Sequence, residues 1–195
     1  MNDQSYQNPQ KQPRYAALLI DMQPGFLNEH NLDDQKMLFL AQRQILGFCV
    51  NENIPVGVLE YQGLTYPGFG QTVDCLREIV DRVPVHSLIQ KDHDNGFEST
   101  PLDEQLHRWN ATDLIVMGIY ACCCVLDTCE SARALGYSLH TARDCIADPI
   151  SDASSYYWYE GCSTLYPTSS DLITAVKLSL QGRNLNLPLE TVGDY

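Results

Sequence analysis

The sequence predicts an α/β protein, a three-layer sandwich with a mainly parallel, Rossmann-like central sheet and helices on both faces. Three observations lead to this prediction. Short apolar runs that suit strands buried on both faces alternate with segments of helical periodicity. Turn residues separate these segments, and no internal repeat or linker divides the chain. A length of 195 residues suits one domain.

The first two elements are a strand and a long helix. Residues 15–20 form a continuous apolar run that ends at Asp21, which predicts a doubly buried strand, and Pro24-Gly25 then breaks the run. Residues 33–53 carry apolar side chains at helical spacing. Residues 1–13 are rich in Asn and Gln, so we expect a mobile tail there and a single domain over 14–195.

The middle of the chain continues the alternation. The expected elements are a strand at 54–60, a loop at 62–70, a short helix at 73–80 and a strand at 83–89 that leads to Lys91.

Two helices with recognisable end signals flank the next strand. The expected helix at 101–109 has Thr100 as its N-cap and Pro101 at its first position. Residues 122–135 predict a deeply buried helix that Gly136 closes. The remaining expected elements are strands at 114–117 and 137–141 and a helix at 169–180.

Charge and hydropathy exclude some partners and suggest a compartment. Twelve Lys and Arg against 25 Asp and Glu give a net charge of -13, which disfavours binding to nucleic acid and to anionic membranes. No apolar run approaches the ~20 residues needed to span a bilayer. The first residues lack the apolar core of a secretory signal, so we expect a cytoplasmic protein.

The eight cysteines do not resemble a disulfide framework, because three of them are consecutive, at 122–124. We expect free thiols, most of them packing residues. Redox sensing by this cluster stays open as a hypothesis.

Three candidate catalytic side chains lie just past the ends of three different predicted strands: Asp21, Lys91 and Cys124. Ligands of parallel sheets bind at this edge. Backbone N–H groups at a helix start and a nearby lysine favour a thiolate at Cys124, and a carboxylate can accept its proton during attack. The same N–H groups can form an oxyanion hole, so these residues predict nucleophilic acyl chemistry.

Three motifs carry a family resemblance. They are DMQPGF at residues 21–26, Lys91 followed by GFEST at 96–100, and GIYACCCVLDT at 118–128, each after a predicted strand. Together they resemble the isochorismatase-like cysteine hydrolases, the superfamily that contains the nicotinamidases. Asp144 matches a further position, and we interpret it as structural. The resemblance covers roughly residues 14–180.

The resemblance implies a role for each candidate residue. Cys124 is the nucleophile, Asp21 the general base and acid, and Lys91 the group that orients or electrostatically supports them. It also implies a cis peptide between Ile119 and Tyr120, with the backbone N–H groups of Tyr120 and Cys124 as the oxyanion hole.

Other residues depart from the nicotinamidase pattern. The Asp-x-His metal motif is replaced by EYQ at 60–62, and no histidine lies between His30 and His86, so we expect neither a metal nor another cofactor. Asp92-His93-Asp94 has the residue types of metal ligands, but we favour a solvated acidic turn. We judge a zinc site among residues 122, 123, 124 and 129 improbable, because neighbouring helical side chains diverge. Residues 156–159 stay open as core, interface or substrate wall. The candidate substrate-binding residues are Phe26, Gln62, Tyr66 and Tyr120.

The function predicted from these residues is a hydrolase that cleaves a small-molecule amide, or a related acyl bond, through a thioester. Two alternatives stay open beside redox sensing: a catalytically silent binding or assembly protein with the same fold, and an isochorismatase-type vinyl-ether hydrolase. We expect a small-molecule substrate and a homo-oligomer, since members of the family often assemble.

Overall fold

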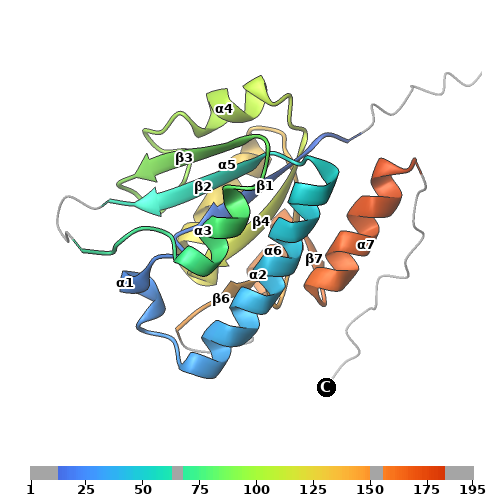
Figure 1. The fold of residues 1–195 in the computed structure, drawn as a ribbon. Coiled ribbons are helices and arrows are strands. Elements are labelled where there is room, and N and C mark those ends of the chain that lie inside the picture. Colours follow the sequence, from blue (N-terminus) through green and yellow to red (C-terminus); the bar gives the residue numbers. More distant parts are fainter. Residues whose placement is uncertain (1–12, 63–67, 150–155, 183–195) are drawn as a thin grey trace, which may run out of the picture.

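The computed structural model describes residues 13–62, 68–149 and 156–182. Its centre is a seven-stranded sheet in the order β3-β2-β1-β4-β5-β7, with β6 paired to β4, and every pairing is parallel (Figure 1). The strands are β1 (Tyr15–Ile20), β2 (Val56–Tyr61), β3 (His86–Lys91), β4 (Asp113–Ile119), β5 (Ser138–Ala142), β6 (Ile146–Ala147) and β7 (Thr164–Tyr166). The predicted parallel α/β sheet is confirmed.

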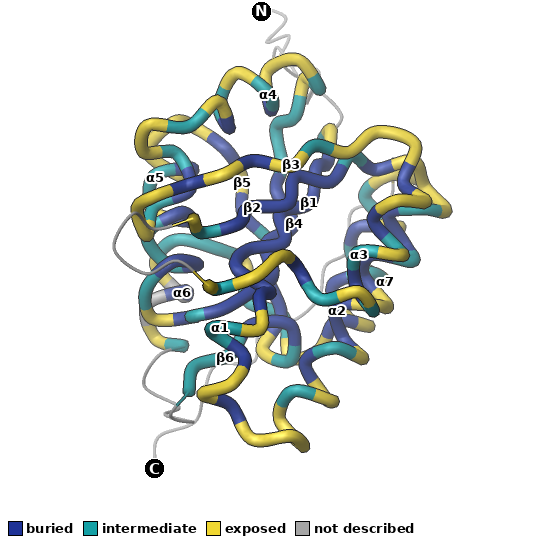
Figure 2. The backbone as a smooth tube through the Cα atoms, turned by 60° about the vertical axis from the view of Figure 1, so that its left-hand side comes forward, coloured by how far each residue is buried: buried dark blue, intermediate teal, exposed yellow. Residues whose placement is uncertain are grey.

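Helices cover both faces of the sheet. In Figures 1 and 2, α2, α3 and α7 lie on one face and α4, α5 and α6 on the other, so the three-layer arrangement is also confirmed. The helices are α1 (Pro24–Leu27), α2 (Leu32–Glu52), α3 (Asp74–Val80), α4 (Leu102–Arg108), the π-helix η1 (Ala121–Val125), α5 (Leu126–Ala134), α6 (Tyr157–Cys162) and α7 (Ser169–Leu180). No helix of the described residues is long and apolar enough to cross a membrane.

The central strands owe their position to their sequence. Every residue of β1 is buried, and six of the seven residues of β4 are, as expected for strands covered on both faces. β1 and β4 pair in register up to Ile20 and Gly118. A Cβ on Gly118 would lie 2.3 Å from the carbonyl oxygen of Ile20, and its φ is +148°, so only glycine allows this close approach.

Polar caps fix the ends of the helices that pack around the sheet. The Asn31 side chain accepts hydrogen bonds from the N–H groups of Asp33 and Asp34 at the start of α2. Asp144 accepts from both the N–H and the hydroxyl of Ser169, the first residue of α7, at 2.7 and 2.9 Å. These contacts agree with the interpretation of Asp144 as a structural residue.

Several predicted boundaries are wrong. β3 begins three residues later than the predicted strand, because Pro84 cannot donate a ladder hydrogen bond and pairing with β2 starts only at His86. Lys91 is thus the last residue of β3. α4 begins after Pro101, although the Thr100 hydroxyl still accepts from the N–H of Leu102 at 3.2 Å.

The predicted helix at 122–135 is divided into η1 and α5, and four short elements, α1, α6, β6 and β7, were not predicted. Each of these four has six residues or fewer, too few for a hydrophobic period. The expected mobile tail falls almost entirely within residues 1–12, outside the described residues.

Candidate active site

The structure brings two of the predicted catalytic side chains into direct contact at the carboxyl edge of the sheet. The Lys91 Nζ lies 2.7 Å from Asp21 Oδ2, and both side chains are fully buried. Asp21 follows β1, and its N–H donates to the carbonyl of Leu59 on β2, which fixes the backbone beside Lys91. Neither Asp21 oxygen receives a well-directed hydrogen bond within the described residues, so the ion pair is the main interaction that compensates its burial.

The Lys91 ammonium is held from the other side by backbone and by an aromatic ring. It donates to the carbonyls of His93 and Asp94, at 3.1 and 3.3 Å, and lies 5.3 Å from the centre of the Tyr61 ring. Burial lowers the pKa of Lys91, but the negative charge of Asp21 beside it raises it, and the net direction is upward. Lys91 is therefore a fixed positive charge.

Cys124 lies beside this pair, in η1 after β4, and is buried. Burial raises the pKa of its thiol, the Asp21 carboxylate raises it further, and Lys91 lowers it, with a net increase. Lys91 acts in the direction expected from the sequence, toward a thiolate, but desolvation and the Asp21 carboxylate outweigh it, so the thiol keeps its proton. Burial also raises the pKa of Asp21, more than Lys91 and Cys124 lower it. A stronger carboxylate base thus lies beside a protonated thiol.

A hydrogen-bonded threonine connects the cysteine to the loop after Lys91. The Thr128 hydroxyl donates to the Cys124 carbonyl at 2.6 Å and accepts from the Gly96 N–H at 2.8 Å. A Cβ on Gly96 would lie 2.3 Å from Leu59 and 3.1 Å from the Thr128 hydroxyl. Two of the sequence motifs are thus fixed to each other at the nucleophile.

The backbone before Cys124 contains an unusual peptide bond. The bond between Ile119 and Tyr120 is cis. Tyr120 is the N-cap of η1, and its carbonyl accepts from the N–H groups of Cys123 and Val125. Its own N–H donates to no other group within the part of the chain that the structure describes.

Sequence analysis missed Asp94 as a neighbour of the site. The Cys124 thiol donates to Asp94 Oδ1 at 3.5 Å, and Asp94 is itself exposed. The interpretation of Asp92-His93-Asp94 as a solvated turn is therefore incomplete. The turn-forming residues gave no signal of this contact, because it depends on how the segment after β3 folds across η1.

Two of the four candidate substrate-binding residues belong to an aromatic cluster. The Phe26 ring lies 4.3 Å from Phe69 and 5.5 Å from Tyr120, measured between ring centres, and Tyr120 stacks on His30 at 5.7 Å. The sequence suggested Phe69 as a residue that lines the pocket or packs the loop, but it did not indicate His30. Of the other two candidates, Gln62 is exposed and Tyr66 lies outside the described residues.

The remaining cysteines differ in environment. All eight cysteines lie within the described residues and are free, which agrees with the prediction. Cys49, Cys129 and Cys145 are buried in the core. Cys122 is exposed, so its interpretation as a packing residue is wrong, and its N–H donates to Asp148.

Part of the aromatic segment at 156–159 supports η1. Tyr159 is fully buried, and its hydroxyl donates to the carbonyl of Ala121. Tyr157 is 67% exposed. Tyr159 is therefore a core residue, and the segment does not have one common role.

The nicotinamidase metal does not fit the residues at the end of β2. Glu60 is buried, and its carboxylate accepts from the N–H of Thr72 at 2.7 Å, so it is already used in the fold. Tyr61 and Gln62 follow where the metal-binding motif has a histidine. Imidazole is the ligand that transition metals favour there, and none is available in this segment.

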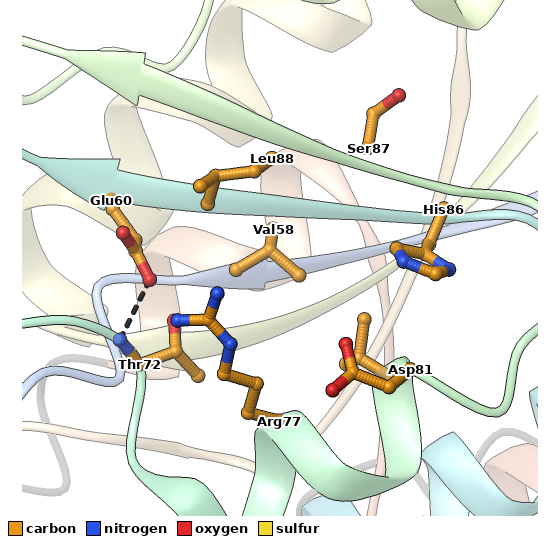
Figure 3. Close-up of a pocket in the computed structure, with 9 residues that line it drawn as sticks. Val58, Glu60, Thr72, Arg77, Asp81, His86, Ser87 and Leu88 are labelled. Atoms are coloured by element: carbon orange, nitrogen blue, oxygen red, sulfur yellow. Dashed lines mark hydrogen bonds between the residues drawn. The ribbon is translucent and has the colours of Figure 1, made fainter.

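The structure also has a cavity of about 100 Å³ that Asp21, Lys91 and Cys124 do not line. It is lined by side chains of β2, β3 and α3, among them Glu60, Arg77 and His86 (Figure 3). Small-molecule sites usually have volumes of about 300–1,000 Å³. We therefore locate the candidate site by its chemistry, at Asp21, Lys91 and Cys124, and not by this cavity.

A protein-family model gives the family to which this fold belongs. Residues 15–161 match the isochorismatase domain, so the chain belongs to the isochorismatase domain family. Members of this family are hydrolases, including amidases that act on C–N bonds. The resemblance found in the sequence is thereby confirmed.

Solved structures of other proteins have a similar fold. N-carbamoylsarcosine amidase from Thermoplasma acidophilum is 17% identical, with a TM-score of 0.70 over 80% of this chain and 96% of that one. The nicotinamidase SaPncA from Staphylococcus aureus is 21% identical, with a TM-score of 0.63 over 78% and 99%. The MAR1 ribonuclease from Caenorhabditis elegans is 18% identical, with a TM-score of 0.72 over 95% and 98%. A search of curated protein sequences gave no significant match.

Proposed function

We propose that this protein is a cysteine hydrolase that cleaves a small-molecule amide, or a related acyl bond, through a thioester intermediate. One observation carries the proposal: a fully buried Asp21–Lys91 ion pair lies beside the buried thiol of Cys124 at the edge where parallel sheets bind ligands. A buried ion pair is costly to desolvate, and such perturbed groups cluster at functional sites.

In the first half-reaction Asp21 takes the thiol proton as the Cys124 sulfur attacks the substrate carbonyl. A C–S bond forms, and the carbonyl π electrons move to the oxygen. We assign the N–H groups of Tyr120 and Cys124 as the donors to this oxyanion, and the Tyr120 N–H, which has no acceptor among the described residues, supports that assignment. When the oxyanion collapses, the C–N bond breaks and protonated Asp21 gives its proton to the leaving amine.

In the second half-reaction water attacks the thioester. Asp21 accepts a proton from this water, the C–S bond breaks, and the returned proton restores the Cys124 thiol. The sum is amide plus water to carboxylic acid plus amine. Lys91 keeps its proton throughout, and its charge holds Asp21 ionised in a buried site.

We assign the aromatic cluster, with Phe26 and Tyr120, to substrate binding. The two rings meet edge to face next to the cysteine, and such surfaces favour flat or apolar groups. Gln62 and Tyr66 remain proposed contributors from the segment after β2.

The proposal is tested by trapping the acyl-enzyme. Purified protein is incubated with small amides, ureides and carbamates, quenched in acid, and its intact mass and peptides are measured. We expect an acyl adduct on Cys124 that is absent from Cys124→Ala and present in Cys122→Ala, the neighbouring exposed thiol. Turnover that persists in Cys124→Ala overturns the proposal and favours a vinyl-ether hydrolase. No turnover, with Cys124 no more reactive to an alkylator than Cys122, favours a silent binding protein.

A matched pair of variants tests which carboxylate is the base, since Asp94 also contacts the thiol. We expect Asp21→Asn to lower kcat/KM by about 10²–10⁴-fold, and Asp94→Asn by less than about tenfold, because Asp94 is exposed and lies outside the buried ion pair. The reverse order would assign the base role to Asp94.

We also propose a homo-oligomer that acts in the cytoplasm. β3 is an edge strand, and Val85 just before it and Leu88 within it are 45% and 49% exposed, which is high for apolar side chains. Light scattering on the purified protein is expected to give a multiple of 22.0 kDa, and Leu88→Asp is expected to lower it. A monomer at all concentrations contradicts the assembly.

A further inference from the structure

Three potential metal ligands from two separate segments meet beside the candidate nucleophile. Asp94 comes from the turn after β3, and Cys123 and Cys124 come from η1. One ligand atom from each, a carboxylate oxygen and two sulfurs, lies within 4.8 Å of the other two. Consecutive helical side chains normally diverge, and the wider π turn reduces the rotation between Cys123 and Cys124.

The spacing and chemistry of these atoms suit a small, soft, divalent cation. In tetrahedral zinc sites, with Zn–S near ~2.3 Å and Zn–O near ~2.1 Å, neighbouring ligand atoms lie about 3.5–3.8 Å apart. The distance from Cys124 Sγ to Asp94 Oδ1 is 3.5 Å, within that range. Two thiolates select zinc-like ions over magnesium or calcium.

The charges around these atoms also favour a cation. Asp127, in the first turn of α5, is close enough to Asp94 for the two carboxylates to repel each other, and burial together with this repulsion raises the pKa of Asp127. Lys91 is a positive charge that acts on both Cys124 and Asp127, and the buried Asp21 neutralises it at 2.7 Å. A cation would therefore relieve repulsion between acidic groups.

We propose that Asp94, Cys123 and Cys124 form a binding site for a thiophilic divalent cation such as Zn²⁺, which blocks the nucleophile and reversibly inhibits the enzyme. On binding, two metal–sulfur bonds form and both thiols release their protons to solvent. The site differs from the nicotinamidase metal position in place and in ligand type. Metal binding itself does not rest on the proposed hydrolase, whereas the inhibition does.

Binding is measured without a substrate. Reduced, metal-free protein is titrated with Zn²⁺ against a chromophoric chelator, and with Cd²⁺ by the ultraviolet absorption of its thiolate bonds. We expect one tight site with two thiolates. Cys123→Ser is expected to leave one thiolate and to weaken binding at least tenfold, and Asp94→Asn to keep two thiolates and weaken binding at least tenfold. Cys122→Ser, the matched control from the same segment, is expected to bind as wild type.

Protection of the thiol gives a second readout. Bound Zn²⁺ is expected to slow alkylation of Cys124 by iodoacetamide at least tenfold, and a chelator to restore it. Circular dichroism of each variant checks the fold. The site is overturned if the wild-type protein binds no metal, or if Cys123→Ser and Asp94→Asn both bind as tightly as wild type. Metal binding with two thiolates in a protein whose turnover does not need Cys124 supports the site and overturns the inhibition.

Discussion

Cys124 and Cys129 lie in one continuous helical segment, yet their charged neighbours differ. Both thiols are buried in the same hydrophobic core, and burial is the main reason that the pKa of each is raised. Cys124 has the Asp21–Lys91 ion pair beside it, whereas Cys129 has two further thiols and Glu130 as its neighbours. Burial alone therefore does not distinguish a candidate nucleophile, and a proton acceptor with a fixed counter-charge does.

The backbone around the two cysteines explains this difference. Cys124 lies in η1, directly after β4, so it meets groups from the ends of other strands. Cys129 lies in α5, whose buried face packs against the sheet and α6. Cys129 is consequently a packing residue. We therefore expect a substitution of Cys129 to affect stability and a substitution of Cys124 to affect turnover.

The largest expected effect is on turnover. We expect Cys124→Ala to lower kcat/KM at least ~10³-fold while the protein stays folded, because the nucleophile is lost. Cys129→Ala is expected to lower the free energy of unfolding by about 0.5–3 kcal/mol and to leave kcat/KM within about threefold. Steady-state kinetics and urea denaturation measure both. Similar kinetic losses in the two variants would remove the distinction between them.

The second effect is on the stability that the buried ion pair controls. We expect Lys91→Met to lower the free energy of unfolding by about 3–5 kcal/mol, because Asp21 keeps an uncompensated buried charge. Adding Asp21→Asn is expected to restore most of this stability but no activity.

The matched control is an exposed ion pair. Lys36 contacts Asp33 at 2.9 Å, with 70% and 90% of the two side chains exposed. Lys36→Met is expected to change the free energy of unfolding by less than about 1 kcal/mol. Equal losses in Lys36→Met and Lys91→Met would show that burial does not decide the strength of the ion pair.

The sequence was sufficient to predict the parallel sheet and the three side chains at its carboxyl edge. Apolar runs and turn residues are local signals, and strand ends share one edge in any parallel sheet. It was insufficient to predict the contact of Asp94 with Cys124, the π turn and the raised pKa of Cys124. These depend on how separate segments pack and on how completely water is excluded, and neither has a signature in local composition.

A smaller loss of stability is expected at Thr128, which links the loop after Lys91 to η1. Thr128→Val keeps the shape but removes the acceptor of the buried Gly96 N–H and the donor to the Cys124 carbonyl. We expect a loss of about 1–3 kcal/mol in the free energy of unfolding. Thr128→Ser keeps both hydrogen bonds and is expected to lose less. A Val variant as stable as wild type would show that this link does not hold the two segments together.

The smallest effect concerns the pH dependence of activity, which depends on how far the pKa of Asp21 differs from that of an ordinary carboxylate. Asp21 must be ionised to accept the thiol proton, and burial raises its pKa above the usual carboxyl value of about 3.9. Activity is therefore lost as the pH falls through this raised pKa, by about tenfold per pH unit below it. We expect the acid limb of kcat/KM, measured with a chelator present, to lie above pH ~4. Asp94→Asn, which removes the exposed carboxylate beside Cys124, is expected to keep that limb, since burial is the main cause of the shift. An acid limb at or below pH ~4 in the wild type would mean that solvent reaches Asp21 in the working enzyme.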